Sequence, residues 1–348
     1  MSYFRKNIEA AEGYVPGEQP TDPSVIKLNT NENPYPPSPR VMEAIRQIDP
    51  EQLRRYPHPL ANAFRDKAAE ILGVTRDMII CGNGMDDILN MTVRAFSGPE
   101  AALVFPVPTY TLYGVLGAIQ ASVVKEVPWG PDYQLPFEAL VQARGRVTYL
   151  ANPNAPTGTL VPLDEVARLA DALDGVLCID EAYVDFAEVN CLELARTRPN
   201  VLVLRTLSKG YSLAGLRFGY AVGDANLISG LMKVKDSYNA DAIAIAAATA
   251  AIADQEYHLQ TRRKVIQERQ RLASALADLG MPALPSQSNF LFARCSRPGA
   301  AEVYERLKAR GILVRYFNSP GINDRVRITV GTPEQNDALI AALREMVA

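Results

Sequence analysis

A lysine that follows a predicted buried strand is the residue of this sequence best placed to do chemistry. Lys209 comes after the apolar run 201–204, and Arg217 lies eight positions further on. A nearby cation and partial removal from water both lower the pKa of a lysine, toward the neutral amine that attacks a carbonyl carbon. The hydroxyls of Thr206 and Ser208 are suited to binding a phosphate. A lone lysine in a loop is usually a solvated charge. Residues elsewhere in the chain must therefore show whether Lys209 is a reactive amine or an ordinary surface lysine.

Three further polar segments follow or end predicted strands. Residues 81–87 (Cys-Gly-Asn-Gly-Met-Asp-Asp) join a strand to an amphipathic helix, and such a turn directs backbone N–H groups toward an anion. Residues 152–158 (Asn-Pro-Asn-Ala-Pro-Thr-Gly) form a stiff loop. Residues 180–183 (Asp-Glu-Ala-Tyr) place a carboxylate at the end of an apolar run, where it needs a partner such as a protonated pyridine nitrogen. Taken singly, each segment is also consistent with a turn or a helix cap.

The elements that must position these segments alternate between strand and helix. Amphipathic patterns predict helices at residues 86–96, 163–173 and 227–235. This alternation is typical of an α/β fold with a mostly parallel sheet covered on both faces, in which ligands bind beyond the carboxyl ends of the strands. The apolar runs that predict strands are residues 78–81, 102–105, 147–150, 175–179 and 201–204.

The regions outside this alternation differ in character. The first 40 or so residues are rich in proline, which excludes a long helix, and a short helix is expected at 40–48. Residues 240–280 have a helix-forming composition almost throughout, and we expect a long helix there that bridges two domains.

The tail predicts a compact α+β unit, with strands and helices at 290–292, 300–310, 312–315, 326–330 and 333–346. A chain of 348 residues exceeds what one hydrophobic core usually supports. We therefore predict an N-terminal segment (1–45) that packs with the small domain, a large domain (46–250) that contains the four polar segments, and a small C-terminal domain (251–348).

Composition excludes several classes of function. The net charge of -3 provides no basic surplus for binding nucleic acid or an anionic membrane surface. The apolar stretches are too short to span a membrane and the start is polar, so we expect a cytoplasmic protein. Four cysteines without C-x-x-C spacing and two histidines are too few for a zinc site or a Ser-His-Asp triad. We therefore expect no metal, and no G-x-G-x-x-G motif indicates a dinucleotide.

The order of these segments resembles that of the fold-type I pyridoxal 5'-phosphate-dependent aminotransferases over essentially the whole chain. The Asn-Pro-x-x-Pro-Thr-Gly segment precedes Asp-Glu-Ala-Tyr, Lys209 follows Asp180 by 29 residues, and Arg217 follows Lys209 by eight. The resemblance implies a large domain with a mostly parallel sheet, a smaller α+β domain, and pyridoxal 5'-phosphate as the cofactor.

The resemblance also implies a role for each matching residue. Lys209 holds the cofactor as an imine and, once released, shuttles a proton between the substrate carbon and the cofactor carbon. Asp180 pairs with the pyridinium nitrogen, so that the ring can draw electrons from the substrate. Tyr183 donates to the phenolic oxygen of the ring, and Tyr110 stacks on its face. The residues that would hold the cofactor phosphate are Gly84, Met85, Asp86, Thr206, Ser208 and Arg217.

Two further residues carry implications from the family. Tyr56, in Arg-Tyr-Pro, resembles the tyrosine that reaches the cofactor phosphate of the partner subunit, which implies a homodimer. Family members often have an asparagine directly before Pro-Thr-Gly that contacts the same ring oxygen as the tyrosine, and here this position is Ala155. Either Asn154 or Asn152 replaces it, or Tyr183 acts alone; we favour Asn154.

Within the family, residues 28–34, 55–57, 205–209 and 325–332 are similar to those of the histidinol-phosphate aminotransferase subgroup. That similarity implies transamination between L-histidinol phosphate and 2-oxoglutarate in histidine biosynthesis, with imidazole-acetol phosphate and glutamate as products. Arg327 and Arg315 would share the substrate phosphate, which suits two forked guanidiniums, and Tyr14 would close over it.

Two enzyme alternatives remain on the same motifs, whereas the sequence argues against a third, non-catalytic one. An aromatic or broad-specificity amino-acid aminotransferase would use the same arginine for a carboxylate. A phosphothreonine-type pyridoxal-phosphate decarboxylase would need sites for both anions. A cofactor-binding regulatory protein without catalysis predicts a missing lysine or an appended DNA-binding segment, and the sequence shows neither.

Overall fold

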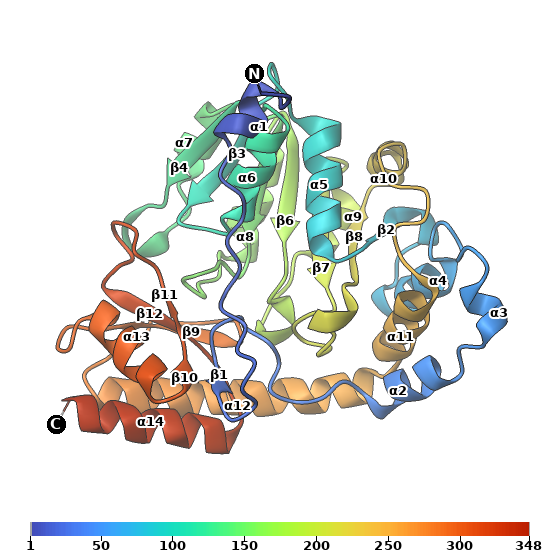
Figure 1. Ribbon diagram of the computed structural model, residues 1–348. Coiled ribbons are helices and arrows are strands. Elements are labelled where there is room, and N and C mark those ends of the chain that lie inside the picture. Colours follow the sequence, from blue (N-terminus) through green and yellow to red (C-terminus); the bar gives the residue numbers. More distant parts are fainter. Residues whose placement is uncertain (1, 348) are drawn as a thin grey trace.

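The computed structural model describes residues 2–347, which form a large α/β part and a smaller α+β part (Figure 1). The large part is built on a seven-stranded sheet in the order β2-β8-β7-β6-β5-β3-β4. β8 is antiparallel to both of its neighbours, and the other pairs are parallel. Its strands are β2 (Ile79–Gly82), β3 (Leu103–Val107), β4 (Val124–Pro128), β5 (Val147–Ala151), β6 (Val176–Asp180), β7 (Val201–Thr206) and β8 (Gly219–Gly223).

This sheet confirms the predicted α/β fold, and all five predicted strands form. β4 and β8 were not predicted. β4 lies at the edge of the sheet and carries exposed Lys125 and Glu126, so it lacks an apolar run. β8 is fully buried but begins and ends with glycine, a residue that strands rarely favour.

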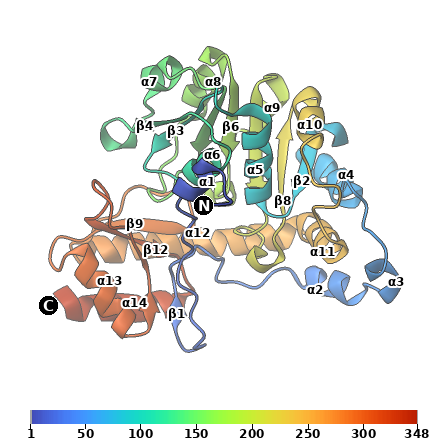
Figure 2. The ribbon, with the colours of Figure 1, turned by 45° about the horizontal axis from the view of Figure 1, so that its top comes forward.

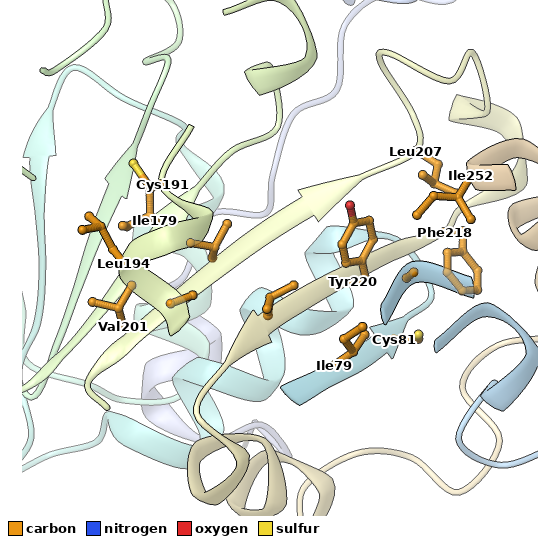
Figure 3. Close-up of a cluster of buried hydrophobic side chains, with 14 of the residues drawn as sticks. Ile79, Cys81, Ile179, Cys191, Leu194, Val201, Leu207, Phe218, Tyr220 and Ile252 are labelled. Atoms are coloured by element: carbon orange, nitrogen blue, oxygen red, sulfur yellow. The ribbon is translucent and has the colours of Figure 1, made fainter. Parts of the chain in front are cut away.

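Side chains that alternate along each strand fill two cores, one on each face of the sheet. Ile79 and Cys81 belong to one cluster, together with Phe218 and Tyr220 (Figure 3), whereas Ile80 points into the other. This period of two is what a sheet covered on both faces requires. The helices of the large part are α4 (Asn62–Leu72), α5 (Met85–Phe96), α6 (Leu112–Ile119), α7 (Phe137–Gln142), α8 (Leu163–Ala172), α9 (Leu192–Thr197), α10 (Ala225–Met232) and α11 (Ala242–Ala253).

The prediction of a single long helix at 240–280 is wrong in one respect. The structure divides this stretch into α11 and α12 (Gln255–Asp278) at Asp254. Asp254 has non-helical dihedral angles, and its carboxylate accepts from the backbone N–H of Tyr257, so it begins a second helix rather than continuing the first. Of these two helices, only α12 runs under both parts of the molecule (Figure 1), and it packs against α14 and β9.

The smaller part consists of two short sheets and two helices beside α12. A three-stranded antiparallel sheet has the order β11-β12-β9, and β10 pairs with the N-terminal strand β1. The strand predicted at 312–315 is divided at Val314, because β10 pairs with β1 and β11 pairs with β12. The elements are β9 (Phe290–Arg294), α13 (Ala300–Ala309), β10 (Ile312–Leu313), β11 (Arg315–Tyr316), β12 (Arg325–Thr329) and α14 (Pro333–Val347).

The N-terminal segment connects the two parts. Its first helix, α1 (Lys6–Ala10), lies against α6, and the chain then runs down to β1 (Ile26–Lys27) (Figures 1 and 2). It continues through α2 (Pro39–Arg46) and α3 (Pro50–Leu53). The predicted domain boundaries stay predictions. Across residues 2–347, no helix is long and apolar enough to cross a membrane.

Candidate active site

The four segments singled out in the sequence end in one cavity of about 290 Å³. The carboxyl ends of β6 and β7 and the start of α5 form one side, and β11, β12 and the N-terminal segment form the other. Of the predicted site residues, those that line this cavity are Tyr14, Met85, Asp86, Tyr110, Asp180, Tyr183, Thr206, Ser208, Lys209, Arg217, Arg315 and Arg327.

Lys209 lies in the loop after β7 and extends its amine across the cavity. Nζ donates to the backbone oxygen of Thr30 at 2.9 Å. Burial lowers the pKa of Lys209 to about 8; Glu32 opposes this shift, whereas Arg327 and Arg217 add to it. At pH 7 about one amine in ten is then neutral, against about one in three thousand for an exposed lysine. The amine is therefore prepared for nucleophilic attack.

Asp180 ends β6 with its carboxylate buried, at 4% exposure. Its Oδ2 accepts from the hydroxyl of Tyr113 at 2.5 Å, and its Oδ1 accepts from the backbone N–H of Ala182 at 2.9 Å. Burial raises the pKa of Asp180 to about 6, although both hydrogen bonds act in the opposite direction. A carboxylate has about four acceptor positions, so Asp180 can still accept from a ligand N–H.

Tyr113 is a site residue that sequence reasoning missed. It is fully buried, and its ring centroid lies 5.6 Å from that of Tyr110. Its position three residues after Tyr110, about one helical turn, was the available signal, but a tyrosine in an apolar stretch is also an ordinary core residue.

The side chains of Tyr183 and Asn31 are joined by a hydrogen bond. The amide Nδ2 of Asn31 donates to the phenol oxygen of Tyr183 at 2.9 Å. The Nζ of Lys209 lies 6.0 Å from the centroid of the Tyr183 ring. Burial raises the pKa of Tyr183, whereas Arg327 and the Asn31 amide lower it. Sequence reasoning included Asn31 only as part of the similar segment 28–34.

One corner of the cavity is built to bind an anion. Gly84 begins α5 with φ +78°, a conformation that favours glycine, and a Cβ there would lie 2.6 Å from the guanidinium of Arg217. Arg217 also donates to Ser208 at 3.4 Å, and Thr206 donates to Ser208 at 2.9 Å. Asp86 lies 3.2 Å from the Arg217 guanidinium. A helix N-terminus beside a cation and two hydroxyls suits a phosphate.

A second cationic region faces the first from the small part. Arg315 and Arg327 are directly paired across β11 and β12, and both line the cavity. Each guanidinium carbon lies 5.5 Å from the Phe317 ring centroid. Arg327 donates to the backbone of Asn29 at 2.9 Å, and its buried Nε has no hydrogen-bond partner within residues 2–347. A buried donor without a partner is costly, which favours an anionic ligand here.

Tyr14 lies at the mouth of this region. Its ring contacts that of Tyr110 edge to face, with the centroids 5.8 Å apart. Because Tyr14 belongs to the segment between α1 and β1, this contact holds the N-terminal segment over the cavity.

The structure does not bring Asn154 into the cavity, contrary to our expectation. Its amide oxygen accepts from Thr109 at 2.9 Å, and its Nδ2 donates to the backbone of Pro108 at 3.1 Å. Asn152 is equally occupied, because it exchanges hydrogen bonds with the backbone of Val161. Both asparagines therefore shape the loop, and Ala155 lines the cavity in the place where the family often has an asparagine.

Tyr56 lies outside this cavity. It is 80% exposed, and its ring stacks on that of Tyr238 at 4.4 Å between centroids. Its role in a neighbouring subunit stays a prediction. The structure shows no cluster of metal-ligating side chains among the residues it describes.

The fold and the cavity that holds Lys209 are those expected of an aminotransferase. The chain belongs to the aminotransferase class I and II family, whose model matches residues 23–343. It is 51% identical to histidinol-phosphate aminotransferase 1 of Nostoc sp. over 99% of this chain and 98% of that protein. It is 44% identical to the histidinol-phosphate aminotransferase of Rhodopirellula baltica, covering 96% and 93% of the two chains.

A solved structure shares the same fold. The histidinol-phosphate aminotransferase of Sinorhizobium meliloti, in complex with pyridoxal-5'-phosphate, superimposes with a TM-score of 0.91 and 30% identity, covering 100% of this chain and 98% of that one. These comparisons confirm the predicted family and its fold class.

Proposed function

We propose that this protein binds pyridoxal 5'-phosphate and transfers an amino group between L-histidinol phosphate and 2-oxoglutarate, giving imidazole-acetol phosphate and glutamate. The observation that carries the proposal is the pairing of Arg315 with Arg327 in the cavity that holds Lys209. The similar proteins of Nostoc sp., Rhodopirellula baltica and Sinorhizobium meliloti are histidinol-phosphate aminotransferases, which supports the same substrate here.

The residues present fit the cofactor. Its aldehyde would bond to Lys209, its ring nitrogen would donate to Asp180, and its phosphate would lie at the corner formed by Arg217 and the start of α5. Asp180 already accepts two hydrogen bonds and is buried, so a cationic N–H would compensate its charge. When bound, the cofactor supplies an electron-withdrawing ring that makes the substrate carbon acidic.

Lys209 would move the proton in this reaction. After its amine is released, Nζ would accept the proton from the substrate carbon and return it to the cofactor side. A pKa of about 8 lets the same nitrogen act as a base and then as an acid near neutral pH. Tyr183 would donate to the phenolic oxygen of the ring, and Tyr110 would cover one face.

The paired arginines would hold the phosphate ester of the substrate. A phosphate dianion can accept bidentate bonds from two guanidiniums at once, whereas a carboxylate carries only one charge. Such an anion would accept from the buried Nε of Arg327, which has no hydrogen-bond partner in the described part of the chain. Tyr14 would close over the ester and keep water away from it.

We further propose a cytoplasmic homodimer. Tyr56 is exposed and does not line the cavity of its own chain, and its ring would reach the cofactor phosphate of the partner subunit.

The test is product formation by the cofactor-loaded protein. Histidinol phosphate with 2-oxoglutarate should give glutamate, and histidinol, which lacks the phosphate, should be at least about a hundredfold poorer in kcat/KM, the effect of losing a charge-assisted anchor. Phenylalanine and phosphothreonine are the competing substrates. Equal rates with phenylalanine would support a broad-specificity enzyme, and carbon dioxide release from phosphothreonine would support the decarboxylase.

A further inference from the structure

Three consecutive residues of the N-terminal segment, 29–31, each contact a different functional residue of the cavity. The backbone oxygen of the first accepts from Arg327 at 2.9 Å. The backbone oxygen of the second accepts from the Nζ of Lys209 at 2.9 Å. The side chain of the third, Asn31, donates to the phenol oxygen of Tyr183 at 2.9 Å. The third contact is the one that a side-chain substitution can test.

The orientation of the Asn31 amide follows from its other contacts. The backbone N–H of Asn31 donates to the hydroxyl oxygen of Thr329 at 3.0 Å, and that hydroxyl donates its one hydrogen to the Asn31 amide oxygen at 3.0 Å. The amide oxygen therefore faces Thr329, and the NH₂ group faces Tyr183. Asn31 is 1% exposed and has φ +58°, a left-handed conformation that asparagine tolerates.

This arrangement determines what the Tyr183 hydroxyl can do. An amide NH₂ only donates, so the phenol oxygen must accept in this bond, and its own hydrogen is free to point elsewhere. Ala155, on the opposite loop, lines the same cavity without any polar side-chain atom. The donor to this phenol thus comes from the N-terminal segment.

We propose that Asn31 is a positioning residue that occupies an acceptor site of the Tyr183 oxygen and leaves the phenol proton directed into the cavity. This role rests on the proposed function, because the acceptor for that proton would be the ring oxygen of the cofactor.

The same residue couples the small domain to the large one. Leu28 packs in the core of the smaller part, and its backbone oxygen accepts from the N–H of Thr329 at 2.9 Å. Asn289, beside β9, donates to the backbone oxygen of Asn31 at 2.9 Å. The small-domain sheet therefore reaches Tyr183 through the Asn31 amide and also through Phe290 of β9, whose ring centroid lies 5.0 Å from that of Tyr183.

Two substitutions separate this role from a structural one. Asn31→Asp keeps the shape and tolerates the left-handed backbone, but it replaces the donor by an acceptor, so the phenol proton would turn toward the carboxylate. Asn31→Gly removes the side chain without backbone strain. Asn7→Asp is the matched control, because Asn7 donates only to the backbone of α6 within the described chain.

The first measurement is a pH titration of the visible absorbance of the cofactor-loaded protein. The charged and titratable groups that face Tyr183 are Asp180, Lys209, Arg327 and Tyr14. Loss of the phenol donor should raise the titration midpoint by about one pH unit in Asn31→Asp and by a smaller amount in Asn31→Gly. We also expect kcat to fall about tenfold while KM changes little.

The second measurement uses the protein without cofactor. Asn31→Gly and Tyr183→Phe are combined in a double-mutant cycle on the equilibrium constant for unfolding, where a shared hydrogen bond gives a coupling of roughly two- to tenfold. Additive effects, or a titration midpoint identical to that of Asn7→Asp, would overturn the proposal. If the loaded protein shows no visible absorbance at all, the proposed function fails, while the cycle still decides whether Asn31 holds Tyr183.

Discussion

The two sides of the cavity are built in different ways. On the large-domain side, Asp180 and Lys209 come directly from the ends of adjacent parallel strands, so local sequence is enough to bring them together. On the other side, Arg327 donates to Asn29 and Thr329 donates to Asn31, and each of these contacts joins residues 298 positions apart. In the function that we propose, the first side carries out the chemistry, and the second binds the substrate and orients Tyr183. Substitutions on the two sides should therefore impair the protein in different ways.

The largest effect is expected on the large-domain side. Lys209→Ala removes both the attachment point of the cofactor and the base, so turnover should fall on the order of 10⁴-fold or more. Glutamate formation measures this, and Lys125→Ala, an exposed lysine on β4, is the control. Activity of Lys209→Ala within a hundredfold of the original protein would place the base elsewhere.

The next effect tests the small-domain side. Arg327→Ala should lower kcat/KM for histidinol phosphate on the order of a hundredfold, because a buried charge-assisted contact to the phosphate is lost. Cofactor absorbance should remain, since the large-domain side is intact. Arg294→Ala, on the neighbouring strand with an exposed side chain, controls for the loss of a cation in this sheet. If Arg327→Ala lowers kcat/KM for histidinol by the same factor, Arg327 does not bind the substrate phosphate.

A smaller effect concerns stability rather than rate. Burial raises the pKa of the Asp180 carboxyl to about 6 in the folded protein, against its ordinary value of 3.8. The folded form therefore holds an extra proton between these values, and the free energy of unfolding falls as pH rises through this window, by at most about 3 kcal/mol. Asp180→Asn should remove this pH dependence of the free energy of unfolding.

Urea unfolding of the cofactor-free protein at a series of pH values from 4 to 7 measures the change. Asp171→Asn is the matched control: Arg198 lowers the pKa of that carboxyl below its ordinary 3.8, so its contribution to stability changes only below about pH 4, and the slope between pH 4 and 7 should stay as in the original protein. If Asp180→Asn leaves the slope unchanged, burial does not destabilise this carboxylate.

The smallest effect is expected for Tyr56, which the partner subunit would contribute to the cavity. Tyr56→Phe should weaken cofactor binding about three- to tenfold, the loss of one hydrogen bond to a phosphate. Equilibrium dialysis with pyridoxal 5'-phosphate measures it, and light scattering measures whether the protein is dimeric. A monomer that binds the cofactor at full affinity would contradict both the dimer and the role of Tyr56.

The difference between the two sides also explains what could be predicted. The parallel sheet and the residues at its strand ends follow from local apolar runs and from motif spacing, as Asp180 and Lys209 illustrate. Asn154 was assigned wrongly because spacing says nothing about side-chain direction, and its amide turns to Thr109 instead. Tyr113 and Asn31 escaped notice because their partners are 67 and 152 positions away.

The helix at 240–280 shows the same limit. Composition favoured helix throughout, yet Asp254 interrupts it, because its carboxylate serves as the cap of α12 and also accepts from Ser38. Ser38 belongs to the N-terminal segment, so the amino-acid pattern around Asp254 does not predict this contact.

The central claim is that the large-domain side binds the cofactor and the paired arginines select a phosphorylated amine. One measurement tests it most directly, namely the visible absorbance of the loaded protein after addition of histidinol phosphate without any oxo acid. We expect the band to decay and to return when 2-oxoglutarate is added, with histidinol much less effective. A band that histidinol phosphate leaves unchanged, but that phenylalanine abolishes, would contradict the account.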